Sequence, residues 1–544
     1  MPTLEWWTRD DDVKAADAVP YRLLQPVPEL GAGDETSLNM LIQGDNLEAL
    51  KALLPFYAGQ VRCIYIDPPY NTGAAHFEHY DDNLEHAQWL EMMYPRLLLL
   101  RNLLSHDGFF CCQIDDSEGP YLKVILDEIF GRTNYLSTLY VQVRYAEKTL
   151  KQDMNFHKQI EQVLIYRGSA TAKPILPSKK GSFEKFCYYI NVDSPSNTIT
   201  LGGKKVEIFN KGSFEIVEQE GSVDGLKEIW ATGTILDGNS SGRFFRDYIT
   251  GRVAEDGLGS LYRVYGIGDD ILPYRYFTGP QRAKATKGKY FQGVPQDKRL
   301  EESASVNSPI ENYYDFSGAF GNCRHEGGVE FRSGKKPEVL LKLLLDRFSS
   351  EGDLILDSFL GSGSTAAVAH KMGRRYIGIE MGEQAQTHCG VRLKNVISGE
   401  KSGISEAVGW QGGGGFRFYR LGPPVFDENG QIREGIGFDT LAAHIWFSET
   451  RIPWRRPAKR KTVLGVVESG LAIVLLYNGI LGDRSVAGGN VLTRATLAVI
   501  RQDCPKNFTG PLLVYGERCT LSDATLKREN ITFKQTPYDV KARA

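Results

Sequence analysis

The sequence predicts an α/β protein with a parallel-rich sheet, an inserted β-rich domain and a small C-terminal α/β domain. Apolar strands and helices alternate over residues 37–169 and again over 331–400, a pattern typical of strand–helix–strand units. Residues 170–330, between these stretches, are rich in glycine and proline and have no long helical period. A chain of 544 residues also exceeds the size of one ordinary domain, so we expect more than one.

The first alternating stretch follows a lead-in, residues 1–36, that we predict to be polar and partly extended. Leu38–Gln43 is a short apolar strand that ends in Gly44-Asp45-Asn46. A second strand, Val61–Ile66, ends in the turn Asp67-Pro68-Pro69-Tyr70. The other predicted elements are helices over 47–54, 87–104 and 118–130 and strands over 108–114, 136–143 and 162–166.

The second alternating stretch predicts a helix over Glu338–Phe348 and a strand over Leu354–Asp357. A glycine-containing loop, Ser358–Gly363, then leads to a helix from Ser364 and a strand over 376–380. The glycine run at 412–415 predicts a linker. Beyond it, the C-terminal domain is predicted to have strands over 471–477, 512–515 and 531–534 and a helix over 491–501.

Composition excludes several classes of protein. The hydrophobic content of 42% and charged content of 24% are those of a soluble globular chain. No run of about 20 apolar residues exists, and residues 1–10 lack a signal-peptide pattern, so we expect a cytoplasmic protein without a membrane span. The eight cysteines have no C-x-x-C spacing, so we expect neither disulfides nor a metal site.

The turn Asp67-Pro68-Pro69-Tyr70 is the most informative motif, because ligands bind at the carboxyl ends of strands in open parallel sheets. The Asp67 carboxylate and the Pro68 carbonyl could accept both hydrogens of a nucleobase amino group and stabilise the positive charge that develops on its nitrogen. The Tyr70 ring could stack on a base swung out of the duplex. The alternative is a plain turn that closes the strand.

The loop Asp357-Ser358-Phe359-Leu360-Gly361-Ser362-Gly363-Ser364-Thr365 lies between a predicted strand and helix. Its glycines allow close approach of the backbone to a ligand, and the helix N-terminus supplies N–H donors. Glu380 ends the next strand, where an acid can accept ribose hydroxyls. The third glycine of a dinucleotide fingerprint is missing, so the pattern favours a nucleoside cofactor without pyrophosphate, and S-adenosylmethionine fits.

Taken together, these motifs resemble the β-class amino-methyltransferases of DNA, most closely the modification subunits of Type III restriction–modification systems. The resemblance rests on Gly44-Asp45-Asn46-Leu47, residues 67–73, residues 108–131, Lys336-Pro337, residues 357–365 and residues 531–540. Two positions depart from the family pattern. Ser364 stands where threonine is usual, and Ile160-Glu161 stands where a His-Glu pair is common.

The resemblance implies a circularly permuted, Rossmann-like methyltransferase sheet. Residues 37–169 would be its catalytic half, 331–400 its cofactor half, 170–330 a target-recognition domain and 401–544 a C-terminal α/β domain. It also implies which residues bind S-adenosylmethionine. Glu380 would bind the ribose, Asp45 or Asn46 the adenine edge, Lys336 and Pro337 would lie near the methionine carboxylate, and the loop residues Asp357, Phe359, Gly361, Ser362, Gly363 and Ser364 would form the cradle. Asp45 could instead simply cap the helix that follows it.

Basic residues gather in two segments. Residues 274–299 contain Arg275, Arg282, Lys284, Lys287 and Lys289, with aromatic residues Tyr274, Tyr276, Phe277, Tyr290 and Phe291 between them. We predict that these cations contact DNA phosphates, and the alternative is a solvated loop. The run Arg451–Lys461 is equally suited to DNA or to a partner subunit.

The leading hypothesis is a site-specific methyltransferase that makes N6-methyladenine in double-stranded DNA. An acidic first residue in Asp67-Pro68-Pro69-Tyr70 favours adenine, because the cytosine-N4 enzymes of the superfamily usually begin with serine. Cytosine-N4 transfer and a non-catalytic DNA-reading subunit of a nuclease are the alternatives. A nicotinamide oxidoreductase would need the missing glycine. The family likeness suggests a homodimer and an ATP-dependent restriction subunit as partner.

Overall fold

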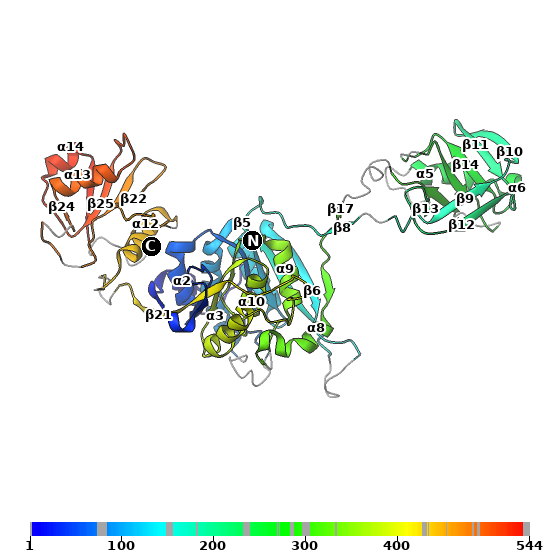
Figure 1. Cartoon of the computed structure of the whole chain (residues 1–544). Helices are drawn as coiled ribbons and strands as arrows, with labels where there is room; N and C mark the ends of the chain where they lie inside the picture. The colour runs from blue at the N-terminus through cyan, green and yellow to red at the C-terminus, as the bar shows by residue number, and fades with distance from the viewer. Residues whose placement is uncertain are drawn as a thin grey trace. The chain divides into compact units, whose positions relative to one another are not determined.

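The structure is a computed structural model that describes residues 3–72, 84–147, 156–180, 183–231, 240–268, 270, 272–282, 288–295, 305–331, 334–426, 432–433, 435–452, 454–480, 483–486 and 490–536. The chain divides into two compact units (Figure 1). The first combines Met1–Ile175 with Glu311–Ala544, and the second is Leu176–Ile310. Among the described residues, no helix combines the length and apolar character needed to cross a bilayer.

A mixed sheet forms the centre of the first unit, in the order β1-β21-β3-β20-β19-β4-β5-β7-β6-β18, with β2 paired to β21. The strands from β21 to β5 run parallel, which confirms the predicted parallel-rich α/β fold. β7 is antiparallel to both of its neighbours. The strands are β1 Arg22–Pro26, β2 Ala32–Gly33, β3 Met40–Gln43, β4 Val61–Ile66, β5 Leu104–Ile114, β6 Tyr135–Gln142, β7 Ile160–Arg167, β18 Tyr313–Asp315, β19 Leu354–Asp357, β20 Arg375–Glu380 and β21 Gly415–Pro424.

Helices cover both faces of this sheet because alternate strand residues point to opposite sides. On one face, Ile64 and Ile66 pack with α2 (Asn46–Tyr57), α3 (His86–Leu103) and α4 (Gly119–Leu126). On the other, Cys63 and Tyr65 pack with α9 (Glu338–Phe348), α10 (Ser364–Lys371) and α11 (Val391–Ile397). Short helical turns follow α4 at Asp127–Gly131 and Arg132–Asn134 and precede α11 at Ala385–Gly390.

Two features at the ends of this sheet differ from the sequence predictions. The lead-in includes a helix that was not predicted, α1 (Arg9–Ala18), which packs against α3, and its extended segment, β1, pairs with β21. The glycine run is not a linker to a separate domain. It leads directly into β21, whose buried Phe416 and Phe418 complete the second core, so the central sheet extends beyond residue 400.

The second unit is largely β-structure, as predicted. Its six-stranded antiparallel sheet has the order β10-β11-β14-β15-β16-β13, and β9 and β12 form a separate ribbon, as do β8 and β17. The predicted range of 170–330 extends too far, because β18 and α8 (Ser317–Asn322) belong to the first unit. The elements are β8 Ser178–Lys180, β9 Tyr188–Val192, β10 Asn197–Leu201, β11 Lys204–Phe209, β12 Phe214–Glu218, β13 Lys227–Ala231, α5 Ser240–Phe244, α6 Val253–Asp256, β14 Leu261–Tyr265, β15 Tyr274–Thr278, β16 Gly288–Gln292 and β17 Ser305–Asn307.

The C-terminal part carries a four-stranded sheet in the order β22-β23-β25-β27 and a two-stranded sheet of β24 and β26. Its core is formed by buried side chains of α12 and the sheet, including Leu441, Leu475 and Tyr515, together with Tyr21 of the N-terminal segment. The elements are α12 Phe438–Thr450, β22 Val463–Val466, β23 Ala472–Leu475, β24 Val491–Leu492, α13 Arg494–Asp503, β25 Leu512–Gly516, β26 Arg518–Cys519, α14 Asp523–Arg528 and β27 Ile531–Gln535.

Candidate functional site

The sheet brings the two predicted motifs together. β4 and β19 lie side by side and parallel, with Ile64 opposite Leu356, so Asp67 and the glycine loop follow at the same edge. β20 is the next parallel strand and ends at Glu380. Residues separated by about three hundred positions in the sequence therefore meet at one place, the carboxyl edge where open α/β sheets bind ligands.

A pocket of about 290 Å³ opens at this edge. Seven of the predicted site residues line it: Asp45, Asn46, Asp67, Pro69, Phe359, Gly361 and Glu380. Sequence reasoning missed other lining residues, among them Met92, Arg96, Phe331 and Gln384. The pocket joins the ends of β3, β4, β19 and β20, so the catalytic and cofactor predictions describe one cavity.

The glycine loop presents its backbone to this pocket. Gly361 has a φ of 56°, and a Cβ built on it meets no atom within 4 Å. Its N–H donates to Glu380 Oε2 at 2.8 Å, and the N–H of Gly382 donates to Oε1 at 3.3 Å. The Glu380 carboxylate is thus fixed at the pocket by two backbone donors, while Gly363 begins α10 at a φ of 82°.

Asp357 lies below the loop and accepts the N–H of Phe359 at 2.9 Å. Burial raises the pKa of its carboxyl to about 7, and the nearby Asp67 and Glu380 carboxylates act in the same direction. Asp357 is 3% exposed and does not line the pocket, so it supports the loop from inside.

At the other end of the pocket, Asp45 caps α2 and also lines the pocket, and its contact with adenine stays a prediction. Its Oδ1 accepts the N–H groups of Leu47 and Glu48 and caps α2, while its Oδ2 faces Arg96 at 2.9 Å. Arg96 also donates to Asn46 Oδ1, and Asn46 donates to the Ser358 carbonyl at 2.8 Å. Arg96 is one of two arginines in the apolar helix predicted at 87–104, and a cation in such a helix is a signal that could have identified it.

The Asp67 carboxylate lies among several polar groups. Lys336 Nζ is 2.8 Å from Oδ2, and the Tyr70 hydroxyl donates to Oδ1 at 2.7 Å. Burial raises the pKa of Asp67, and Lys336 opposes this shift. The Pro69 carbonyl accepts the Trp89 indole N–H at 2.8 Å, so it is engaged in holding the turn.

Lys336 lies at the Asp67 end of the pocket. Its ammonium contacts Asp67 and lies 4.9 Å from the centre of the Tyr70 ring, and Lys336 is not among the pocket-lining residues, so its contact with the methionine carboxylate stays a prediction. Pro337 is the N-cap residue of α9 and also lies outside the lining. The reason is that the segment before α9 runs beside the end of β4.

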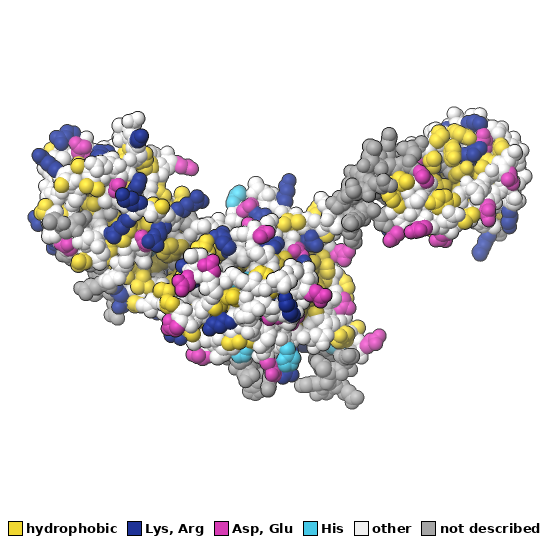
Figure 2. Space-filling model, in the orientation of Figure 1, with side chains coloured by type: hydrophobic (Ala, Val, Ile, Leu, Met, Phe, Trp, Pro, Cys, Tyr) yellow, Lys and Arg dark blue, Asp and Glu magenta, His cyan; other side chains and the backbone are white. Residues whose placement is uncertain are grey.

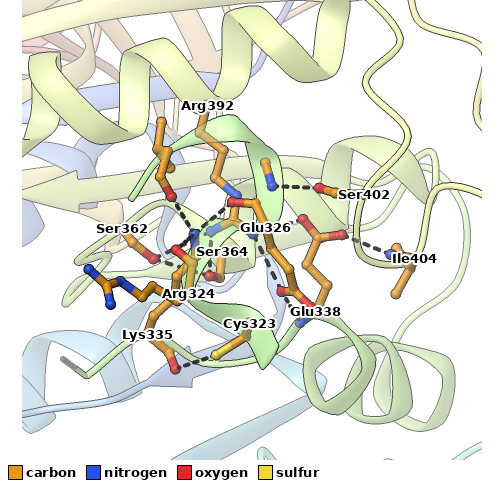
Figure 3. A network of polar contacts seen from close by, with 12 residues as sticks. Cys323, Arg324, Glu326, Lys335, Glu338, Ser362, Ser364, Arg392, Ser402 and Ile404 are labelled. Carbon is orange, nitrogen blue, oxygen red and sulfur yellow. Dashed lines mark hydrogen bonds and ion pairs between the residues drawn. The ribbon is translucent and has the colours of Figure 1, made fainter. Parts of the chain in front are cut away.

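Ser362 and Ser364, which were also predicted to bind the cofactor, are not among the pocket-lining residues. Their hydroxyls turn into the protein, where Arg392 donates to Ser364 Oγ at 2.6 Å (Figure 3). Arg392 is fully buried and pairs with Glu338 at 2.7 Å, and Glu338 in turn accepts from Lys371 at 2.7 Å and from the N–H of Ile404 at 3.0 Å. This buried network holds the glycine loop from behind.

The predicted DNA contacts are only partly accessible. Arg275 is 5% exposed and pairs with Asp270 at 3.0 Å inside the second unit, so its prediction as a phosphate contact is wrong. The aromatic residues expected between the cations pack in the sheet because β15 and β16 are interior strands. Tyr276, Phe277, Tyr290 and Phe291 are all buried.

Two of the other predicted cations can be placed. Arg282 is exposed, and Lys289 pairs with Glu228 at 2.6 Å and lies 4.8 Å from the centre of the exposed Trp230 ring. Lys284 and Lys287 lie outside the described residues. In the second basic run, Arg455, Arg456, Lys459, Arg460 and Lys461 are exposed on the C-terminal part, and Figure 2 shows several Lys and Arg side chains on that part.

Comparison with known proteins agrees with this site. A family model described as DNA methylase, for N6 and N4 methyltransferases, matches residues 61–389. The "Probable type III restriction-modification enzyme HindVI Mod subunit" of Haemophilus influenzae is 33% identical over 420 residues, which cover 71% of this chain and 54% of that protein. The "Type III restriction-modification enzyme EcoPI Mod subunit" of Escherichia phage P1 is 37% identical over 377 residues, which cover 62% and 56%.

The chain therefore spans about half the length of these relatives. Among solved structures, the PvuII DNA methyltransferase (cytosine-N4-specific) aligns with a TM-score of 0.33 and 13% identity, covering 69% of this chain and 91% of that one.

Proposed function

Because the chain belongs to the DNA methylase family, whose model matches residues 61–389, we propose that it transfers a methyl group from S-adenosylmethionine to adenine N6 in double-stranded DNA. The observation that carries the proposal is the single pocket that joins Asp67 to Gly361 and Glu380. An acceptor for an amino group and a cradle for a nucleoside thus face the same cavity.

The cofactor end of the pocket suits S-adenosylmethionine. A side chain at Gly361 would enter open space, so the absence of a Cβ leaves room for a ligand. The Glu380 carboxylate can accept ribose hydroxyls, and Asp45, Asn46 and Phe359 line the same pocket. When bound, S-adenosylmethionine supplies an electrophilic methyl group.

The catalytic end suits an amino nucleophile. Asp67 reaches the pocket as a carboxylate held by Lys336 and Tyr70, and can accept an amino hydrogen where positive charge develops. Since Trp89 occupies the Pro69 carbonyl, the Pro68 carbonyl is the backbone acceptor that we assign to the second hydrogen. Such fixed acceptors need no reorganisation during the reaction.

Adenine is preferred over cytosine because the motif begins with Asp67 and not with the serine usual in cytosine-N4 enzymes. Cytosine-N4 transfer remains the second candidate, since the matched family covers both N6 and N4 methylation. A non-catalytic DNA-reading subunit is disfavoured by the intact acceptor and glycine loop.

We further propose that the second unit chooses the target sequence and that the protein is the modification subunit of a Type III-like restriction–modification system. The relatives named as Mod subunits support this assignment. A homodimer and an ATP-dependent restriction subunit as partner belong to the same proposal. So does a cytoplasmic location, where the DNA is found.

The test is transfer of an isotopically labelled methyl group by purified protein to duplex DNA, followed by digestion to nucleosides and mass spectrometry. We expect label in N6-methyl-2′-deoxyadenosine. Label in N4-methyl-2′-deoxycytidine would establish the second candidate, and no transfer by folded protein that binds S-adenosylmethionine would favour the non-catalytic reader.

A further inference from the structure

The Tyr70 hydroxyl lies between two carboxylates. It is 2.7 Å from Asp67 Oδ1 and 2.8 Å from Glu161 Oε2. A phenol carries one proton, so it can donate fully to only one of two carboxylate acceptors at a time. The arrangement is therefore a chain of two short hydrogen bonds that leads from Asp67 to Glu161, a residue of β7 that the pocket does not include.

We propose that Glu161 is the terminal acceptor of the proton released by the methylated amino group, and that it receives this proton from Asp67 through Tyr70. The inference rests on the proposed function and deepens it, because it assigns the route by which the reaction loses its proton. Glu161 does not touch the reacting atoms, so it acts through its neighbours.

The steps balance in atoms and charge. The amino nitrogen forms a bond to the methyl carbon while the carbon–sulfur bond of the sulfonium breaks and its electron pair stays on sulfur. The nitrogen then has one proton in excess, which passes to Asp67. Asp67 returns to its carboxylate form by giving a proton to the Tyr70 oxygen as Tyr70 gives its own proton to Glu161.

Exposure explains why the proton would leave through Glu161. The Asp67 side chain is 18% exposed, but Asp67 lines the pocket that a flipped base would fill. The Glu161 side chain is 19% exposed and is not among the pocket-lining residues. We therefore assign the exit of the proton to Glu161, whose side chain is exposed to a similar degree without lining the pocket.

The surroundings fix Glu161 in place for this role. Gln113 Nε2 donates to Glu161 Oε2 at 2.6 Å, and the Tyr65 hydroxyl donates to Gln113 Oε1 at 2.6 Å, so the amide is oriented by its other partner. Lys336 Nζ is 3.9 Å from Glu161 and 2.8 Å from Asp67. Two carboxylates and one ammonium carry a net negative charge, and an incoming proton neutralises it.

Other titratable groups lie within electrostatic range of Asp67. Tyr65 comes from β4, the strand that ends before Asp67, Cys112 from the neighbouring strand β5, and Asp357 from β19. Burial raises the pKa of Asp67, and Glu161 acts in the same direction as a like charge, so Asp67 is suited to hold a proton briefly.

The alternative is that Glu161 only balances the charge of Lys336. In that case Tyr70→Phe, which keeps both carboxylates and the aromatic ring, would leave the proton transfer untouched. In the relay, Tyr70→Phe and Glu161→Gln interrupt the same path. Their effects on the rate should then be non-additive, as for groups that act as one unit.

The experiment measures single-turnover methyl transfer from about pH 6 to about pH 9. Glu161→Gln, Tyr70→Phe, the double variant and Glu161→Ala are compared with the wild type. Tyr166→Phe is the matched control, because it removes a buried tyrosine hydroxyl that donates to another carboxylate, Asp127, at 2.7 Å and that lies on β7 but outside the path. Affinity for S-adenosylmethionine, measured by calorimetry, reports whether each variant keeps its fold.

We expect each single variant on the path to lose about 10-fold to 100-fold in rate, and the double variant to lose no more than about threefold beyond that. Added formate should accelerate Glu161→Ala and leave the wild type and Glu161→Gln unchanged, because only the alanine leaves space for a small carboxylate. Rates of Glu161→Gln and Tyr70→Phe equal to those of wild type across the pH range would overturn the relay, as would additive losses without formate rescue. If the wild type is active and these variants behave in this way, only the relay is overturned. If the wild type itself transfers no methyl group, the proposed function is overturned as well.

Discussion

Replacing Lys336 with methionine removes the ammonium that faces Asp67 while keeping a side chain of similar length. The two side chains are 9% and 18% exposed, so solvent screens their 2.8 Å contact only weakly. Removing one partner of such a pair leaves an uncompensated buried charge, which typically costs about 3–5 kcal/mol. We therefore expect Lys336→Met to lower the melting temperature by several degrees at neutral pH.

The sign of the pH dependence follows from the Asp67 pKa. Burial raises this pKa and Lys336 lowers it, so the substitution raises it further. A carboxyl whose folded pKa lies above its unfolded value contributes stability that is lost as pH rises through the folded pKa. The loss of melting temperature in Lys336→Met should thus be larger at pH 8 than at pH 5, and the acid limb of its rate profile should move to higher pH.

The assay is differential scanning fluorimetry at both pH values together with the rate of methyl transfer against pH. Lys342→Met is the control, since Lys342 makes a partly exposed i,i+4 pair with Asp346 on the same helix, α9, and should cost at most about 0.5 kcal/mol. If Lys336→Met loses the same melting temperature at the two pH values and its rate of methyl transfer has the same pH profile as the wild type, the assignment of Lys336 to the Asp67 carboxylate is refuted.

Three further predictions test other parts of the molecule. Gly361→Val should weaken S-adenosylmethionine binding by at least about 10-fold in calorimetry. The control is Gly352→Val, which also has a positive φ and open space around a Cβ but lies outside the pocket, so it should bear similar backbone strain with unchanged affinity. Equal affinity of the two variants for S-adenosylmethionine would contradict the loop assignment. Neutralising Lys284, Lys287 and Lys289 together should weaken binding to all duplexes and lower the slope of log affinity against log salt concentration by about one unit per lost contact. Arg275→Met should instead destabilise the second unit, because Asp270 is left buried without that partner. An unchanged salt slope in the triple variant would count against this segment as a phosphate-binding surface. Exchanging residues 176–310 for the matching unit of a relative should change the methylated sequence, and specificity that stays with the rest of the chain would show that target choice lies elsewhere.

Local sequence patterns were sufficient for the elements around the site. The strand over Val61–Ile66, the helix over Glu338–Phe348 and the strand over Leu354–Asp357 occur within the predicted bounds. Each is an apolar run or a clear helical period closed by proline, glycine or an acidic turn. Such boundaries depend on the chemistry of neighbouring residues, so a single sequence is enough to predict them.

Long-range pairing accounts for what the sequence did not predict. The strand Gly415–Pro424 follows a glycine run typical of a linker, yet it pairs with β3, nearly four hundred residues earlier. In the same way, no local pattern indicates that Lys336 faces Asp67 or that Arg392 holds Ser364. Tyr276 and Phe291 are cross-strand partners in the second unit. The alternation of side chains along these segments could have indicated that they are strands of a sheet.

The proposed reaction is methylation of adenine N6 in duplex DNA at the Asp67 pocket. It can be tested by base-resolved detection of modified bases in the DNA of cells that express the wild type or Asp67→Ala. We expect N6-methyladenine at one recurring sequence with the wild type and none with Asp67→Ala, since loss of such an acceptor costs about 100-fold or more. Modified adenine at the same sites in cells with the folded alanine variant would contradict it, and so would N4-methylcytosine in place of N6-methyladenine.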